Sequence, residues 1–242
     1  MITAGVDLAA QPERTAACRI EWADGRAAVI DLAARDVDDE RIAALLTASE
    51  RTGVDVPLGW PDAFIAAVSA HHAARPWAGR ATTGLRMRAT DEWVHRRTGR
   101  WPLSVSTDRI GVPALRAARL LAGVPAAADR SGRGAVVEVY PAAALRVWGF
   151  DARRYKRAAG VAARHALVQA FRAETHAWLA MDEHRWSACE ASDDAFDAVL
   201  CALVARAAAR GLVELCPPEL REVAAREGWI ALPLEGSLSR LA

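Results

Sequence analysis

Residues 16–32 have the sequence AACRIEWADGRAAVIDL, in which two short apolar runs flank a turn. The Asp24-Gly25 pair in the middle is a typical β-hairpin signal. An earlier apolar run, residues 2–8, is separated from the hairpin by a polar turn that contains Pro12. The sequence therefore predicts three consecutive antiparallel strands, at 2–8, 16–22 and 27–32.

A helix and a fourth strand are predicted to follow the hairpin. Ile42, Leu45 and Leu46 have helical spacing, and acidic residues precede them, where the helix dipole favours negative charge. Residues 52–57 then form a compact apolar run that stops at Pro57. Because a strand that follows a crossover helix runs parallel to an earlier strand, we expect the fourth strand to be parallel to one of the first three.

The rest of the chain predicts further helices and one more strand. Residues 61 to about 123 have a helical pattern rich in Arg and Trp, residues 136–140 form a short apolar strand, and two long helical patterns follow at 164–179 and 193–210. We therefore predict one α/β domain over residues 1–242. Its mixed five-stranded sheet has three antiparallel strands followed by parallel strands and is flanked by helices, with a helical insertion at 61–130.

The composition is that of an ordinary globular protein. The chain has 242 residues, of which 52% are hydrophobic and 25% are charged, and its 9 Trp argue against a coiled coil. The formal net charge is +1, but residues 1–60 carry a net charge of −5 and residues 75–119 a net charge of +7. An acidic metal site beside a basic strip for phosphate would produce this asymmetry, and so would a chance distribution of solvated faces.

Cysteine spacing and hydropathy argue against two further classes. The 4 Cys residues form no C-x-x-C pair and have no His at metal spacing, so we expect small core residues rather than a zinc site. No run of about 18 uncharged apolar residues occurs, and no basic segment followed by an apolar stretch opens the chain. The sequence therefore predicts a cytoplasmic protein with no membrane partner, and it leaves the oligomeric state open.

Five acidic residues lie where a carboxylate is unusual or can converge with others. Asp7, Asp55 and Glu138 each lie inside a predicted buried strand, where a carboxylate is costly unless charged partners meet it. Asp194 and Asp197 are three residues apart on the last long helix, so they project from one face. A helix cap, a turn or a salt bridge would also explain any one of these acids taken alone.

Acids that converge from several elements are what metal-assisted phosphodiester hydrolysis requires. Mg²⁺ and Mn²⁺ prefer hard oxygen ligands, and two such ions about 3.5 to 4 Å apart activate the attacking water and stabilise the leaving oxygen. The acids together therefore favour a Mg²⁺- or Mn²⁺-dependent phosphodiester hydrolase, for which nucleic acid is the expected substrate. The sequence contains no Walker A, G-x-G-x-x-G or G-x-S-x-G motif, which argues against P-loop, dinucleotide-binding and serine-hydrolase chemistry.

The order of the elements and the positions of the acids resemble the RNase H fold, especially RuvC-type resolvases, in which the first and fourth strands lie side by side. A closer resemblance, over nearly the whole chain, is to the DUF429 family of predicted RNase H-like nucleases. Five ordered motifs carry it: GVDVPLGWP at 53–61, RATD at 88–91, VEVYPAAAL at 137–145, YK at 155–156 and DAFDA at 194–198.

The resemblance implies a metal-binding core of Asp7, Asp55 and Asp197, with Asp194 alongside and Glu138 from the neighbouring strand closing the group. These five residues are the implied catalytic and metal-binding set. RNase H and RuvC-type enzymes usually have Glu at the fourth-strand position, and Asp55 is shorter by one methylene. This departure leaves two alternatives open, a different metal spacing or the loss of one metal site.

Arg88, Arg109 and Lys156 are candidates for contacts to substrate phosphate, because they lie in or beside the family-like motifs and a polyanion needs positive charge next to the acids. Arg88 can equally form a structural ion pair with Asp91, three residues along the chain. The tryptophans of the same region can stack on unpaired bases or pack within the protein; they are Trp77, Trp93 and Trp101.

Two function classes follow from these observations. The first is the metal-dependent nuclease. The alternative is a non-catalytic RNase H-like protein that binds nucleic acid or a nucleotide, in a binding or regulatory role. An actin-like ATPase would need two acid-bearing halves, whereas the chain has one set of motifs. The geometric test of the first class is whether the carboxylates of Asp7, Asp55 and Asp197 converge.

Overall fold

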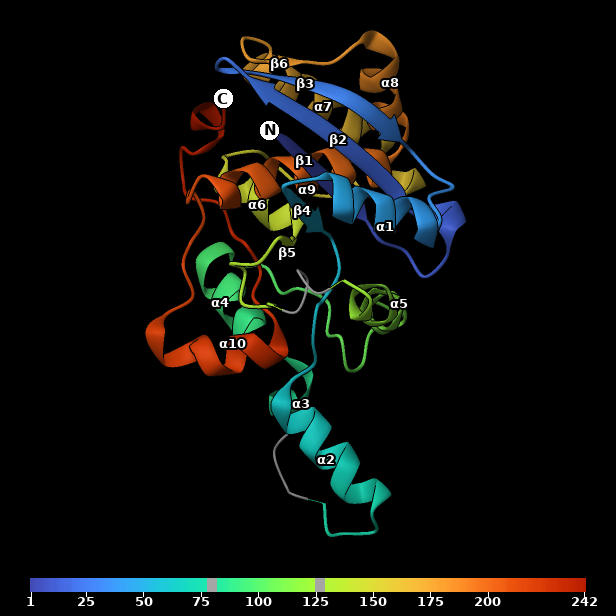
Figure 1. Ribbon diagram of the computed structural model, residues 1–242, viewed down its shortest axis with the longest axis vertical. Helices are drawn as coiled ribbons and strands as arrows, with labels where there is room; N and C mark the ends of the chain where they lie inside the picture. Colours follow the sequence, from blue (N-terminus) through green and yellow to red (C-terminus); the bar gives the residue numbers. More distant parts are fainter. Residues whose placement is uncertain (78–81, 125–128) are drawn as a thin grey trace.

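The structure is a computed structural model that describes residues 1–77, 82–124 and 129–242 (Figure 1). Within these residues, six strands form one mixed sheet in the order β5-β4-β1-β2-β3-β6. The strands are β1 (Ile2–Asp7), β2 (Ala16–Ala23), β3 (Arg26–Ala33), β4 (Arg51–Val54), β5 (Val136–Glu138) and β6 (Leu179–Ala180). The pairs β1–β2 and β2–β3 are antiparallel, and the other three pairs are parallel.

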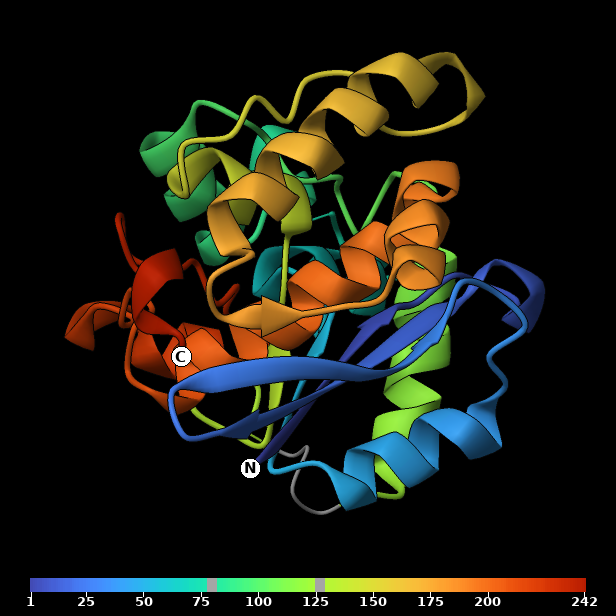
Figure 2. The same ribbon diagram turned by 90° about the horizontal axis from the view of Figure 1, so that it is seen from above.

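The sheet lies between two layers of helices (Figure 2). The helices are α1 (Asp39–Ala48), α2 (Asp62–His72), α3 (Thr83–Arg86), α4 (Ala89–Thr98), α5 (Gly111–Ala122), α6 (Pro141–Val147), α7 (Val161–Thr175), α8 (Glu183–Ala191), α9 (Asp193–Ala209) and α10 (Arg221–Glu227). Helix α9 packs directly on one face of the sheet, with α6, α7 and α8 around it, and α1 and α5 cover the other face. Short 3-10 helices lie at Pro12–Arg14, Ala158–Gly160, Pro218–Leu220 and Leu238–Arg240.

The predicted hairpin is confirmed. β2 and β3 pair in antiparallel register around a turn in which Asp24 has a φ of 50° and Gly25 a φ of 73°. A two-residue hairpin turn with two positive φ angles matches the right-handed twist of the flanking strands, and Asp and Gly are the residues that tolerate it best. The local sequence therefore determines the register of this hairpin.

The parallel pairing of the first and fourth strands is also confirmed. Helix α1 begins after Asp38, whose side chain accepts a hydrogen bond from the backbone N–H of Arg41. The chain then returns as β4, which pairs in parallel with β1 so that Gly5 lies opposite Gly53 and Val6 opposite Val54. Two Gly-Val-Asp segments are thereby aligned side by side, and both reach the carboxyl ends of β1 and β4.

Two glycines let α9 approach this pair of strands closely. A Cβ atom added to Gly5 would lie 2.0 Å from the backbone oxygen of Ala198, and one added to Gly53 would lie 2.3 Å from that of Cys201. The neighbouring Val6 and Val54 point to the opposite face, where they belong to the core under α1. Since side chains alternate along a strand, the residues two positions after each glycine point toward α9.

The predicted insertion contains α2, α3, α4 and α5, and its residues 78–81 and 125–128 lie outside the described residues. Helices α2 and α3 extend away from the sheet (Figure 1). Helix α5, by contrast, contributes Ala114 and Ala117 to the core under the sheet. The assignment of these residues to an insertion within a single domain therefore stays a prediction.

The observed sheet differs from the predicted one in two places. It has a sixth strand, because the predicted helix at 164–179 ends at Thr175 and Leu179–Ala180 pair with β3. The fourth strand ends at Val54, so Asp55 follows the strand rather than lying inside it. The architecture is consistent with an RNase H-like fold. Among the described helices, none combines the length and apolar character needed to cross a lipid bilayer.

Candidate metal centre

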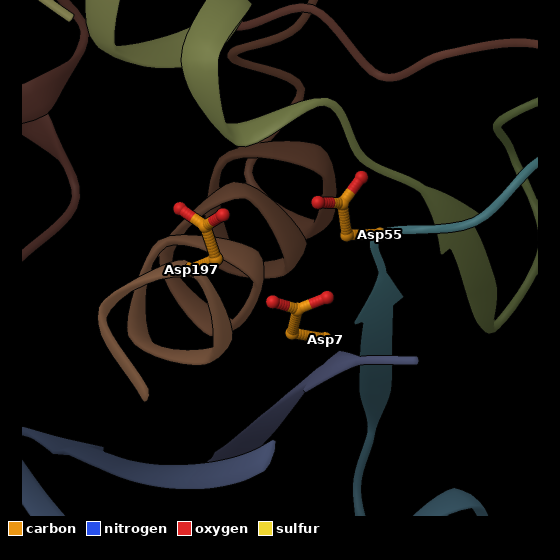
Figure 3. Close-up of side chains that lie close together, drawn as sticks. All are labelled: Asp7, Asp55 and Asp197. Carbon is orange, nitrogen blue, oxygen red and sulfur yellow. The ribbon is translucent and has the colours of Figure 1, made fainter. Parts of the chain in front are cut away.

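Three of the five predicted acids lie together at one edge of the sheet (Figure 3). Asp7 is the last residue of β1, Asp55 follows β4, and Asp197 lies on the second turn of α9. One carboxylate oxygen of each lies within 4.8 Å of the others. We call these three residues the carboxylate cluster.

The backbone explains why the three carboxylates meet. Asp7 and Asp55 each come two residues after a glycine that touches α9, and β1 and β4 are in register. Asp197 immediately precedes Ala198, and the carbonyl of Ala198 lies against Gly5. The close contact between helix and sheet therefore brings the Asp197 carboxylate to the ends of the two strands.

Burial and mutual repulsion make the cluster electrostatically unfavourable without a cation. Burial raises the pKa of Asp7 well above its ordinary value, and the charges of Asp55 and Asp197 raise it further. Burial also raises the pKa of Asp55 to about 7, although the ammonium of Lys156 opposes the shift. The pKa of Asp197 is raised by burial against the opposing effects of Lys156 and Tyr155. A bound cation would lower all three pKa values.

Asp197 has two partners from the loop between α6 and α7. The Tyr155 hydroxyl donates a hydrogen bond of 2.7 Å to Oδ1. Nζ of Lys156 lies 2.5 Å from Oδ2 and 3.7 Å from Oδ2 of Asp55. Although burial lowers the pKa of Lys156, the negative charges of Asp197 and Asp55 raise it well above its ordinary value. Lys156 is therefore a permanent positive charge beside the cluster.

The donor set fits a hard divalent cation. Among the described residues, the carboxylates of Asp7 and Asp55 accept no hydrogen bond, Asp55 has an ion-pair contact with Lys156 at 3.7 Å, and Oδ2 of Asp197 is buried with an ion-pair contact but no hydrogen bond. Unpartnered carboxylate oxygens that face one another are the ligands that Mg²⁺ and Mn²⁺ prefer. The three Asp residues could therefore hold a metal ion.

Asp194 lies beside the cluster without belonging to it. It is half-buried and precedes Asp197 by one turn of α9. Burial raises its pKa, and so do the charges of Asp193 and Asp197. Within the described residues, only Asp7, Asp55 and Asp197 form a group with mutual ligand distances short enough for one ion. Asp194 therefore adds to the local negative field.

Glu138 and Arg88 form a buried ion pair with each other. Arg88 Nη2 lies 2.6 Å from Oε1 of Glu138, and Nη1 lies 2.8 Å from Oε2. Arg88 also bonds both oxygens of Asp91 and donates to the backbone oxygen of Glu227 at 3.0 Å. Its five N–H groups are thus all engaged, and its side chain is 1% exposed. Of the two interpretations of Arg88, the structural ion pair with Asp91 is the one observed.

The Glu138–Arg88 pair supports the segment that follows Asp55. Oε2 of Glu138 also accepts a hydrogen bond of 3.0 Å from the backbone N–H of Leu58, three residues after Asp55. The pair packs against Gly228, where φ is +91° and an added Cβ would lie 2.9 Å from Oε2 of Glu138. Glu138 therefore touches the backbone behind the cluster, and the carboxylate cluster does not include it.

The remaining candidate residues have different environments. Arg109 is exposed, and among the described residues its side chain has no ion pair or hydrogen bond. Trp93 donates a hydrogen bond to Glu214 at 2.8 Å. Trp77 and Trp101 are each 48% exposed, and Trp101 stacks on His95 at 4.0 Å between ring centroids. Trp101 thus has a free area on its surface, whereas Trp93 is fixed by its polar contact.

Sequence reasoning missed two residues that support the site. Tyr155 is buried and orients Asp197, and its only signal was its place next to Lys156 in a family-like motif. Arg164 is also buried and donates to the backbone oxygens of Tyr155, Glu190 and Ala191. No local pattern distinguishes Arg164 from the other arginines of the chain, because its acceptors are backbone atoms brought near only by the fold.

Comparison with known proteins gives one match. The family model described as "Protein of unknown function (DUF429)" matches residues 5–222. No curated protein and no solved structure matches the chain. The matched segment contains the whole carboxylate cluster together with Lys156 and Glu138. Because this match covers most of its length, the chain belongs to the DUF429 family.

Proposed function

We propose that this protein is a Mg²⁺- or Mn²⁺-dependent nuclease that hydrolyses phosphodiester bonds in nucleic acid. The observation that carries the proposal is the convergence of Asp7, Asp55 and Asp197, from two strands and one helix, within 4.8 Å. Three carboxylates brought together and largely removed from water are costly to keep ionised. A cation bound by the three carboxylates would offset this electrostatic cost.

The residues of the site have separate roles in this proposal. A divalent ion held by the cluster would supply Lewis-acid stabilisation and an activated water. Tyr155 fixes the orientation of Asp197 through its 2.7 Å hydrogen bond. Lys156, which is partly exposed, presents positive charge where the phosphate of a substrate would approach. Asp194 lies at the edge of the cluster, where a carboxylate can accept a proton from water.

Nucleic acid is the substrate that the surrounding charges favour. Residues 75–119 carry a net charge of +7, and although Arg88 is buried against Glu138 and Asp91, the exposed arginines of the segment would reduce the repulsion between a polyanion and the acidic cluster. Arg109 is exposed within this segment and is the candidate for a contact to the phosphate backbone. Trp101 offers an exposed ring on which a base of a single strand can stack.

The experiment is a cleavage assay on labelled single-stranded DNA, duplex DNA, RNA, RNA/DNA hybrid and branched DNA. Each substrate is incubated with the purified chain in Mg²⁺, in Mn²⁺ and in EDTA. We expect cleavage of at least one substrate with either metal and none in EDTA. Asp7→Asn is expected to abolish this cleavage, because it removes one charged ligand from the cluster.

Asp36→Asn is the matched control. Asp36 is exposed, and its φ of 60° suits Asn as well as Asp, so this variant should cut as the native chain does. Cleavage that persists in Asp7→Asn would point to a contaminant and contradict the proposal. Folded native protein that binds nucleic acid or a nucleotide but cuts none of the five substrates would favour the non-catalytic alternative.

A further inference from the structure

Lys156 is the only lysine in the chain. Of the 31 basic Lys and Arg residues, the other 30 are arginines. The one lysine lies in the carboxylate cluster, with Nζ 2.5 Å from Oδ2 of Asp197 and 3.7 Å from Oδ2 of Asp55. The ammonium of lysine is a compact point charge, whereas the guanidinium of arginine is a broad planar fork. The one lysine ammonium of the chain therefore lies next to carboxylates that could otherwise bind a metal ion.

The loop that carries Lys156 has a strained backbone. Arg154 has a φ of 59°, and Arg157 has a φ of 66° with a ψ of 177°. The second combination is adopted almost only by glycine, so the backbone here is held in sparsely populated conformations. Strain of this kind persists only where the surroundings over-determine the backbone, and it is concentrated at functional sites. The position of Lys156 is therefore imposed by the fold.

Two contacts impose this position. The carboxylate of Asp193, at the start of α9, accepts a hydrogen bond of 3.0 Å from the backbone N–H of Arg157. The buried guanidinium of Arg164, on α7, donates a hydrogen bond of 2.9 Å to the backbone oxygen of Tyr155. The residues on both sides of Lys156 are thus held by the helices that flank the cluster. The backbone at Lys156 is therefore fixed beside α9, and the ion pair with Asp197 holds the ammonium there.

The charges of the site balance for one divalent ion. The three ionised carboxylates of the cluster carry three negative charges, and Lys156 contributes one positive charge. Two negative charges remain, which one Mg²⁺ or Mn²⁺ neutralises. A second divalent ion would give the cluster and Lys156 a net charge of +2, of which the half-buried Asp194 could offset only one, and excess charge at buried carboxylates is unfavourable.

The position of the ammonium leads to the same conclusion. Nζ of Lys156 faces Oδ2 of Asp55 and Oδ2 of Asp197, which are oxygens that a second ion shared by these two residues would use. Asp7 has no contact with Lys156 in the described structure and stays available as a ligand. One side of the cluster is therefore already filled by a positive group of the protein.

We propose that the Lys156 ammonium takes the place of a second metal ion, so that the cluster binds one divalent ion per chain. This inference rests on the metal site of the proposed function but not on cleavage of any substrate. Lys156 is then a positioning residue that sets the metal count. A site with one ion and one fixed ammonium keeps two cations at the cluster, and the presence of only one of them depends on the metal concentration.

The test is the stoichiometry of Mn²⁺ binding to the metal-free full chain. Isothermal titration calorimetry and the electron paramagnetic resonance signal of unbound Mn²⁺ both count bound ions without any substrate. We expect one ion for the native chain, two for Lys156→Gln and one for Lys156→Arg, which keeps the charge. The control is Arg154→Gln, which removes an exposed charge of the same loop and should still bind one ion.

Each outcome decides the inference. Two ions in the native chain, or one ion in folded Lys156→Gln, would overturn it, and so would binding by Lys156→Gln but not by the native chain. If Lys156→Gln does not fold, Mn²⁺ anomalous scattering from native crystals decides instead, since one peak is expected and two would contradict the inference. A chain that binds one ion and cuts nothing would disprove the nuclease alone, whereas a nuclease with two ions would disprove this inference alone.

Discussion

Asp55 is the carboxylate whose ionisation is most sensitive near neutral pH. Burial raises its pKa from 3.8 to about 7, even though Lys156 opposes the shift. Between these two values the folded chain binds a proton that the unfolded chain does not. The free energy of unfolding therefore falls as the pH rises through this window, and the destabilisation is complete above pH 7. A bound divalent ion would remove it.

The Asp55→Asn variant tests this pH dependence. We expect it to raise the free energy of unfolding of the metal-free protein by about 3–4 kcal/mol at pH 8, because it removes a poorly compensated charge and one pKa unit corresponds to about 1.4 kcal/mol. At pH 5 the difference should be less than half as large, because stability has then fallen through only part of the window between the two pKa values. Urea unfolding in EDTA at pH 5, 6, 7 and 8 measures the difference. Parallel curves of stability against pH for the two proteins would contradict the prediction.

At the scale of elements, the contact between α9 and the sheet is the feature that assembles the site. Gly53→Ala should weaken it, since the added Cβ would lie 2.3 Å from the backbone oxygen of Cys201 and 2.9 Å from Val139. We expect a loss of about 3 kcal/mol of stability, because backbone cannot yield as a flexible side chain does. Gly123→Ala is the control, as its Cβ would have no neighbour closer than 4.0 Å. Equal thermal unfolding temperatures for both variants would contradict this account.

The ion pair between β5 and α4 is the second feature at this scale. Glu138→Gln removes one charge from a buried pair, which leaves the guanidinium of Arg88 with Asp91 alone, and we expect a loss of about 3 kcal/mol. Glu92→Gln, which breaks an exposed pair with Arg96, should change the stability by less than about 0.5 kcal/mol. Both are measured by urea unfolding. If Glu138→Gln keeps its stability but loses Mn²⁺ binding, Glu138 is a metal ligand.

For the molecule as a whole, the elements that could be predicted from the sequence are those with a strong local sequence pattern. The Asp24-Gly25 turn, the parallel return to β4 and the Ala-rich α9 were all predicted because each has a strong local signal, and they suffice to bring Asp7, Asp55 and Asp197 together. The strand β6 was not predicted, because two residues carry no periodic pattern and their pairing with β3 is a tertiary contact.

The chemistry of individual side chains depended more on tertiary contacts. Glu138 looked like a metal ligand because a carboxylate in a buried strand needs a cation, and it has one, but that cation is Arg88, 50 residues away in the chain. Lys156 was predicted as a phosphate contact, and its ion pair with Asp197 depends on a loop with positive φ at two arginines. No propensity predicts such a conformation for arginine.

The uneven charge of the whole chain leads to a prediction on substrate binding. At a net charge of +1, long-range attraction to a polyanion is weak, so binding must depend on local cations such as Arg109. Arg109→Gln, made in the Asp7→Asn background to prevent cleavage, should weaken binding of single-stranded DNA irrespective of its sequence. The slope of log binding constant against log salt concentration should become shallower by about 0.7, the value for one phosphate contact on a single strand.

Fluorescence anisotropy over a salt series measures both effects. The control is Arg35→Gln, because the Arg35 side chain is 69% exposed and pairs with Asp36. An unchanged slope in Arg109→Gln would mean that Arg109 does not contact phosphate, and the binding surface would then have to lie elsewhere on the molecule.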